Sequence, residues 1–121
     1  MLLSLRLPRI HELMDSAAIE AVHVRAGVEL PVGAKLADIT VDLSAIAAQD
    51  CPPVSHYRIV LRERLWLREL RMARGDDVAV GSTLALFTTD PAEATAAEPQ
   101  REARIAIAGI LSQPEWTVSS A

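Results

Sequence analysis

The side chains that could perform nucleophilic or metal chemistry are few and scattered. Cys51 is the single cysteine, and the histidines are His11, His23 and His56. A cysteine nucleophile needs a base and an orienting group, and metal sites usually show closely spaced ligand pairs such as Cys-x-x-Cys. The sequence contains no such pair. We therefore name no catalytic residue and no metal ligand, and an enzyme stays among the alternatives given below.

An arginine-rich stretch from Arg58 to Arg74 could support recognition rather than catalysis. It holds six arginines against two glutamates. Arginine binds carboxylate or phosphate through two parallel hydrogen bonds, and arginines and aromatic residues are enriched at the centres of interfaces. The alternative is a solvated strand face whose arginines balance the acidic remainder. The predicted interaction surface consists of Tyr57, Arg58, Arg62, Arg64 and Trp66.

The composition limits the partners and the compartment. A net charge of −4 and a pI near 5.3 argue against nucleic-acid binding. The single cysteine excludes an intrachain disulfide and fits a reducing compartment. No stretch approaches the ~18 apolar residues that a membrane helix needs. We expect a cytoplasmic protein that binds a protein partner, with no contact to nucleic acid or membrane.

Two segments, residues 19–42 and 67–90, repeat one pattern. The spacing between them is 48 residues, the distance from Gly27 to Gly75, and it holds without a gap. Matching glycines inside matching apolar frames are a signature of internal duplication. Besides the first glycine pair, the matched positions include Leu30 with Val78, Gly33 with Gly81, Leu36 with Leu84, Ile39 with Phe87, and Asp42 with Asp90.

Each repeat unit predicts β-structure. Val22 and Val24 alternate with polar residues, which is the period of a half-buried strand. The glycines mark the places where the chain must turn. With half of the residues hydrophobic and only 3% aromatic, the core must consist of small aliphatic side chains. Each unit is therefore expected to form strand, turn, short strand, turn and strand.

The rest of the chain divides around these units. We expect an edge strand before Pro8, a strand at His56–Leu61, and a strand within 105–111 that could pair in its own chain or form a homodimer through a sheet edge. The expected organisation is a β domain over residues 1–90 with an insert at about 55–64, an acidic linker at 91–104, and a C-terminal strand and tail at 105–121.

Several motifs stand in an order known from one family. They are Leu7-Pro8, the run from Val24 to Gly33, and the run from Ala73 to Gly81 followed by Leu84-Ala85. With them the sequence resembles the biotinyl/lipoyl-domain family over about residues 3–90. The resemblance implies an all-β fold, a flattened barrel or sandwich of two small sheets with a quasi-two-fold repeat. The insert and the C-terminal strand are additions to that pattern.

The resemblance also shows where a cofactor would be attached. The family carries lipoate or biotin on a lysine at a hairpin tip between the two halves, in a pattern like Asp-Lys-Ala. Here Asp42 keeps its place, Leu43 stands at the lysine position, and Ser44 follows. The biotin-type Met-Lys-Met is absent as well. The resemblance thus implies the scaffold without lipoate, biotin or any other cofactor.

The sequence supports three hypotheses for the function. The first is a non-catalytic protein-interaction module that has lost cofactor attachment and is accessory to an acyl-transfer or carboxylase-type complex. The second is a carrier modified at an unconventional residue, Ser44 or Lys35, the single lysine of the chain. The third is a small ligand-binding protein or enzyme that uses a groove beside the insert.

Overall fold

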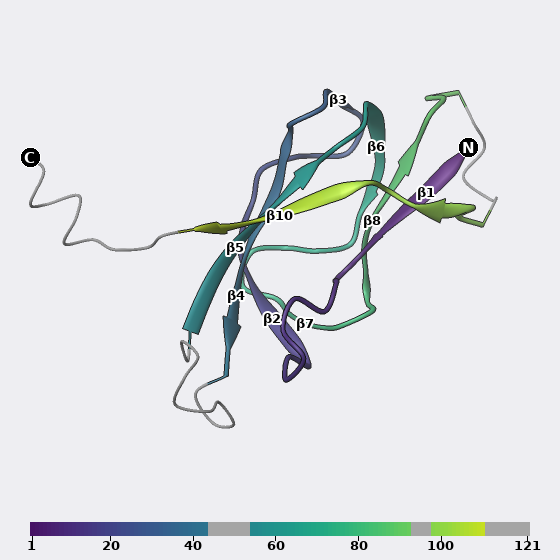
Figure 1. The fold of residues 1–121 in the computed structure, drawn as a ribbon. Coiled ribbons are helices and arrows are strands. Elements are labelled where there is room, and N and C mark those ends of the chain that lie inside the picture. Colours follow the sequence, from purple (N-terminus) through teal and green to yellow (C-terminus); the bar gives the residue numbers. More distant parts are fainter. Residues whose placement is uncertain (44–53, 93–97, 111–121) are drawn as a thin grey trace, which may run out of the picture.

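The chain forms an all-β sandwich in the computed structural model, which describes residues 1–43, 54–92 and 98–110. Ten strands and no helix occur in this described part (Figure 1). The strands are β1 (Leu2–Arg6), β2 (Ser16–Val22), β3 (Glu29–Leu30), β4 (Lys35–Asp42), β5 (Val54–Leu61), β6 (Leu65–Leu70), β7 (Asp77–Ala79), β8 (Thr83–Thr88), β9 (Arg101–Glu102) and β10 (Ile105–Ile110).

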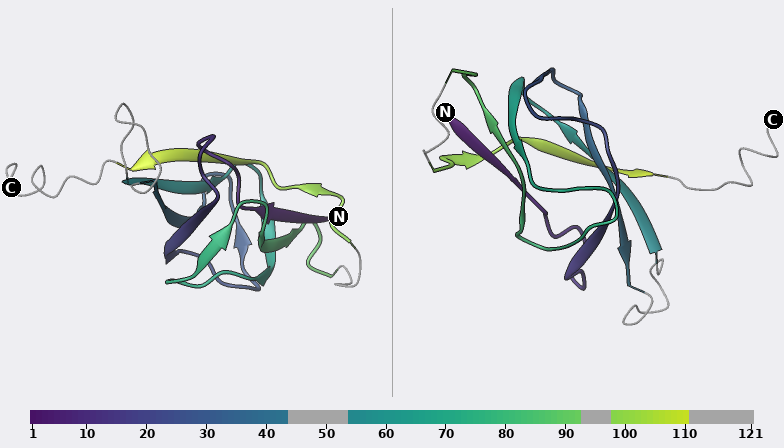
Figure 2. Two further views of the ribbon diagram at one scale, coloured as in Figure 1. Left: turned by 90° about the horizontal axis from the view of Figure 1, so that it is seen from below. Right: turned by 180° about the vertical axis from the view of Figure 1, so that it is seen from behind.

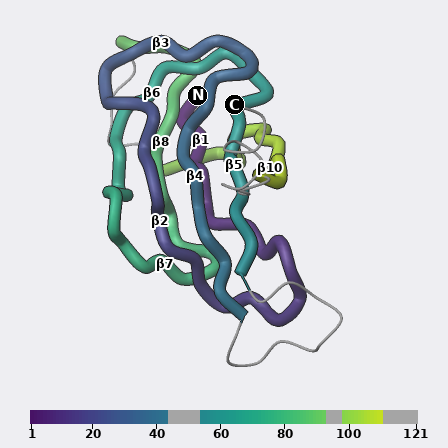
Figure 3. The backbone as a smooth tube through the Cα atoms, turned by 90° about the vertical axis from the view of Figure 1, so that its left-hand side faces the viewer, coloured from purple at the N-terminus to yellow at the C-terminus, as the bar shows by residue number. Residues whose placement is uncertain are grey.

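The strands are arranged in two five-stranded sheets. The first has the order β3-β6-β8-β1-β9 and the second the order β7-β2-β4-β5-β10. Figure 3 shows β4 of the second sheet between β2 and β5, with β10 beyond β5. Only the β1–β9 pair is parallel among the described strands. Neither sheet closes on itself in the described part, so the architecture is a sandwich of two open sheets.

The internal repeat is present in the strand arrangement. A shift of 48 residues carries β2, β3 and β4 onto β6, β7 and β8, and the strand ends agree to within two residues. The pairing irregularities agree too, because the β2–β4 register shifts between Ile19 and Ala21 and the β6–β8 register between Leu67 and Glu69. The short strand of each unit pairs with the other unit, β3 with β6 and β7 with β2. The two units therefore interlock.

The segment predicted as an insert, about residues 55–64, lies mostly in β5, which is a central strand of the fold. In the second sheet β5 pairs with β4, the third strand of the first repeat unit. In the first sheet β1 pairs with β8, the equivalent strand of the second unit. β5 therefore holds the same place in its sheet that β1 holds in the other. The amide of Leu7 donates to the Ser82 carbonyl at 2.9 Å, and that of Leu61 donates to the Ala34 carbonyl at 2.8 Å. These bonds are equivalent in the two units. Strand β1 is also not the edge strand that we expected, because β9 pairs along its outer side.

Four glycines hold equivalent backbone conformations in the two units. Gly27 and Gly75 have φ values of 90° and 93°, and Gly33 and Gly81 have 91° and 89°. L-residues rarely adopt such values, because the Cβ atom approaches the neighbouring carbonyl oxygen. The turns of each unit therefore depend on glycine at these positions, as the sequence pattern predicted.

The core lies between the facing sides of the two sheets. In β4 the buried side chains include Leu36, Ile39 and Val41, and in β8 they include Leu84 and Phe87. Burial of an aliphatic or aromatic side chain stabilises the fold by about 1.5–3 kcal/mol. Because Ile39 and Phe87 are equivalent in the repeat, both units contribute a large side chain to the centre.

The segment after β9 connects the two sheets. The amide of Ala103 donates to the carbonyl of Ser4 in β1, at 2.9 Å, and Ala103 itself is buried. The next residue accepts a bond of 2.8 Å from the amide of Arg62, directly after β5. Strand β10 then pairs with β5 along its length. Figure 2 shows β9 and β10 following one another along this side of the sandwich.

Glu63 holds this connection in place. Its carboxylate accepts hydrogen bonds from both terminal nitrogens of Arg101, at 2.6 and 2.8 Å, and from the backbone amide of Arg104, at 2.7 Å. The Arg101 guanidinium keeps the pKa of Glu63 below its ordinary value. The second half of the predicted linker is thus bound to the body of the fold, while residues 93–97 lie outside the described residues.

Candidate functional site

The position that the sequence assigns to the family's lysine lies at the end of β4. Asp42 is the last residue of that strand and is exposed. Leu43 follows it with only 6% of its surface exposed and belongs to the hydrophobic core. Ser44 and Cys51 lie outside the described residues. A buried alkyl side chain offers no group for acylation at this place.

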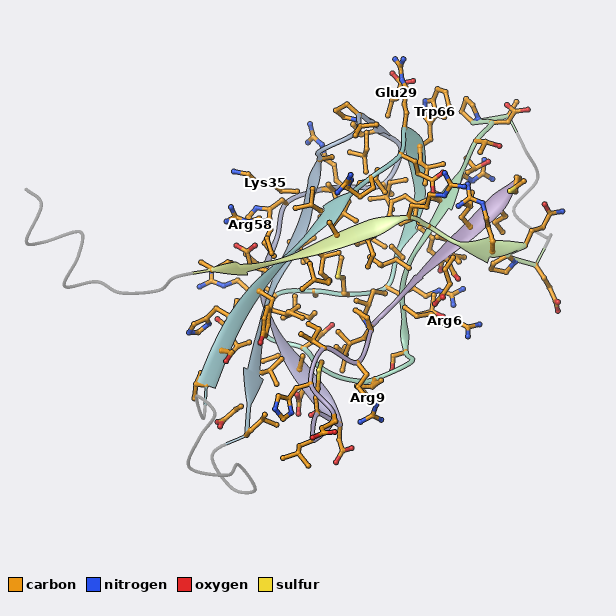
Figure 4. All side chains as sticks on the ribbon, in the orientation of Figure 1. Arg6, Arg9, Glu29, Lys35, Arg58 and Trp66 are labelled. Atoms are coloured by element: carbon orange, nitrogen blue, oxygen red, sulfur yellow. The ribbon has the colours of Figure 1, made fainter. Side chains whose placement is uncertain are left out.

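Lys35 lies at the opposite end of the same strand. It is the first residue of β4, it is exposed, and it pairs with Val60 where the β4–β5 register shifts (Figure 4). At the rise of a β-strand, Lys35 and Leu43 are about 25 Å apart. Lys35 therefore belongs to the strand that enters the hairpin and not to the hairpin tip.

The outer face of the second sheet carries a polar cluster that the sequence analysis did not predict. Arg58 in β5 donates two hydrogen bonds to the carboxylate of Asp38 in β4, at 2.8 and 3.1 Å. The Nε2 atom of His23 lies 3.0 Å from Oδ2 of the same carboxylate, the oxygen that also accepts from Arg58 Nη2. Arg58 and Asp38 are directly opposite in the β4–β5 register. The cluster is thus a cross-strand pair extended by a histidine.

A second polar row lies on the same face. The hydroxyl of Thr40 donates to Glu20 Oε1 at 2.8 Å and lies 2.9 Å from His56 Nδ1. Because the hydroxyl has one proton, which it donates to Glu20, His56 completes the row by donating from Nδ1. Thr40 is opposite His56 in the register. A hollow beside this row is lined by residues that include Glu20, Thr40, Asp42 and Asp77, which give it an acidic character.

These two rows are connected internally and offer little for catalysis. The Arg58 guanidinium holds the pKa of Asp38 below its ordinary value of 3.8, with a smaller contribution from His23, while burial acts in the opposite direction. The carboxylate is therefore a stable anion and a poor general base near neutral pH. Among the described residues, no group of three or more acidic, histidine or cysteine side chains could hold a metal ion.

The five residues of the predicted interaction surface fall in different places. Tyr57 packs against the hydrophobic core, and Arg58 is bound to Asp38 on the outer face of the second sheet. Arg62, Arg64 and Trp66 lie at the end of the molecule where β5 leads into β6. These three are close along the chain, and the structure links Arg64 and Trp66 through Glu29. Arg58 is separated from them because the β4–β5 pairing sets it opposite Asp38.

We name this end the apical surface. The guanidinium of Arg64 donates to Glu29 at 2.9 Å, and Glu29 pairs with Trp66 between β3 and β6 (Figure 4). The turn that contains Val32 reaches the same end, because the amide of Gly33 donates to the Leu61 carbonyl at 2.7 Å. The apical surface consists of Glu29, Val32, Arg62, Arg64 and Trp66.

Its side chains combine apolar and basic character. Val32 is the most exposed large hydrophobic residue of the described part, at 62%. Arg62 is exposed, and in the described part its side chain makes no ion pair. The Arg64–Glu29 pair is open to solvent, with side-chain exposures of 68% and 37%. Exposed ion pairs of this kind contribute little to stability and exchange readily for another partner.

No protein-family model matches this sequence, and no curated protein matches it. In the described part of the chain, no helix is long and apolar enough to cross a membrane.

Proposed function

We propose that this protein is a non-catalytic interaction module of the biotinyl/lipoyl type that has lost cofactor attachment and docks a protein partner. The observation that carries the proposal is the burial of Leu43. In a carrier, the residue at this place must be a solvent-exposed lysine. Here it is an alkyl side chain with 6% exposure that belongs to the core. The position has become part of the packing that holds the two sheets together.

The apical surface is the proposed docking site. It presents an exposed aliphatic side chain, a half-buried tryptophan and an arginine that has no ion pair in the described part. Tryptophan and arginine are the residue types most enriched at the energetic centres of interfaces. The partner that fits is a protein segment with an apolar residue for Val32 and Trp66 and a carboxylate for Arg62. By the family resemblance, we propose a component of an acyl-transfer or carboxylase-type complex.

The docking proposal is tested by affinity capture from the protein's own host. We expect a partner that binds the wild type, is lost with Arg62→Ser/Arg64→Ser, and elutes as salt is raised, because exposed charge pairs are screened. Arg6→Ser is the matched control, since Arg6 is an exposed arginine on β1, away from the apical surface (Figure 4). A partner that the double variant still retains would contradict the proposal, as would the absence of any partner.

Arg58→Ser provides a second comparison. Because Arg58 is bound to Asp38, we expect this variant to lower stability and to leave docking unchanged when the protein is folded. Loss of docking in a folded Arg58→Ser variant would instead place the contact on the outer face of the second sheet.

The carrier hypothesis is the alternative to this proposal, with Lys35 or Ser44 as the attachment residue. Lys35 is exposed, but it lies at the start of β4. The intact mass of the protein from its own host distinguishes an unmodified interaction module from a modified carrier. We place the protein in the cytoplasm, on the ground that its single cysteine fits a reducing compartment.

A further inference from the structure

The four outermost strands of the two sheets differ greatly in length. β3 and β9 at the ends of the first sheet have two residues each, and β7 at one end of the second sheet has three. β10 at the other end has six. Outermost strands expose unpaired amide and carbonyl groups, and proteins commonly keep them short to prevent association. Of these four, only β10 is long enough to pair extensively with another strand.

The composition of β10 favours such pairing. Its sequence is Ile-Ala-Ile-Ala-Gly-Ile, which contains no charge and no proline. By contrast, Asp76 and Asp77 place negative charge at the start of β7, which disfavours pairing with another strand. In the described part, β10 pairs only with β5, and no described strand lies along its other edge. Ile105 and Ile107 pack against the core but stay partly exposed, which leaves apolar area to be buried.

We propose that β10 pairs antiparallel with β10 of a second copy of this chain and joins the two second sheets into one continuous sheet. A two-fold axis perpendicular to the sheet keeps each residue on its own face. Side chains alternate between the two faces of a strand, so a residue can lie opposite itself or opposite a residue an even number of positions away. A register centred on Ile107 places that residue opposite itself, Ala106 opposite Ala108, and Ile105 opposite Gly109 of the second copy.

This register explains why the partner is a second copy. It sets Ile105 opposite the strand's one glycine, pairs small alanines on the outer face, and brings Ile107 of the two copies together on the apolar face. No like charges meet within the strand, because it has none. The same large-to-small pairing occurs inside the chain, where Gly109 lies opposite Tyr57 of β5. The proposal is independent of the docking at the apical surface.

Sedimentation equilibrium of the full chain tests this pairing. A six-residue strand pair is smaller than a standard interface of about 1,600 Å², so we expect a weak dimer with a dissociation constant in roughly the micromolar to millimolar range. Ala108→Lys places a charge on the exposed face of β10 and should raise that constant about tenfold or more. Ala79→Lys is the control, since it makes the same change on β7 at the other end of the same sheet.

A cross-link tests the register itself. In a Cys51→Ser background, Ala106→Cys/Ala108→Cys should give a covalent dimer on mild oxidation, because residues directly opposite in an antiparallel pair lie within disulfide range. Ala79→Cys in the same background should give no covalent dimer. A monomer at all concentrations overturns the proposal, and so does a dimer that Ala108→Lys leaves unchanged. A dimer that does not cross-link overturns the register centred on Ile107.

Discussion

At the scale of single residues, Asp38 shows how neighbouring strands fix one another's side chains. Its carboxylate is shared between Arg58 and His23, and only 17% of its side chain is exposed. The sequence places these three residues in different segments, and their meeting depends on the register between β4 and β5 and on the path of the chain after β2. This is why the sequence pattern predicts Arg58 in an interaction surface and gives no sign of its pairing with Asp38.

Asp38→Asn should lower the free energy of unfolding by about 1 kcal/mol near neutral pH, since it weakens two charged hydrogen bonds at a partly exposed site. The pKa of Asp38 is lowered in the folded protein, so its stabilising effect is complete above its ordinary value of 3.8 and is lost as the pH falls through the lowered value. Urea unfolding of both proteins between about pH 7 and about pH 3 should show the difference shrinking with acid. A difference that stays constant over this range would contradict the assignment.

At the scale of elements, the repeated turns account for most of what the sequence predicts correctly. The glycine spacing and the alternating apolar residues located β2 to β4 and β6 to β8. The equivalence of β1 and β5 was missed, because strand pairing matches Ser4 with Arg58 and Leu3 with Tyr57, which are chemically unlike. The shared signal is an alternating apolar pair: Leu5 in β1 with Leu7 directly after that strand, and Ile59 with Leu61 in β5. The two-residue β9 has too few residues to show any period.

The turns also provide a test of the symmetry. Gly33→Ala and Gly81→Ala should each lower the free energy of unfolding by about 1–2 kcal/mol, because an added Cβ meets no atom and only the positive φ is penalised. The two values should agree within about 0.5 kcal/mol, since the turns are equivalent. Gly109→Ala is the control, because its φ is ordinary and its surroundings are open, and it should be close to neutral. Strongly unequal effects at Gly33 and Gly81 would count against equivalent turns.

At the scale of the whole molecule, duplication builds the sandwich and the C-terminal segment breaks its symmetry. β9 and β10 occupy equivalent places in the two sheet orders, but β9 is parallel to β1 while β10 is antiparallel to β5. The two directions differ because β9 and β10 belong to one continuous segment that crosses from the first sheet to the second. The crossing, held by Glu63, makes β10 the one long outermost strand among the described strands. The two surfaces that we propose for association, the apical surface and the β10 edge, are thus separate.

We propose that this protein carries no covalently attached cofactor. Intact mass spectrometry of the full chain purified from its own host tests this most directly, with a known lipoylated or biotinylated protein from the same cells as the positive control. We predict the mass of the unmodified chain, because Leu43 is buried at the position of attachment. A mass higher by one lipoyl, biotinyl or phosphopantetheinyl group, and restored to the unmodified value by Lys35→Arg or Ser44→Ala, would contradict the account and identify the protein as a carrier.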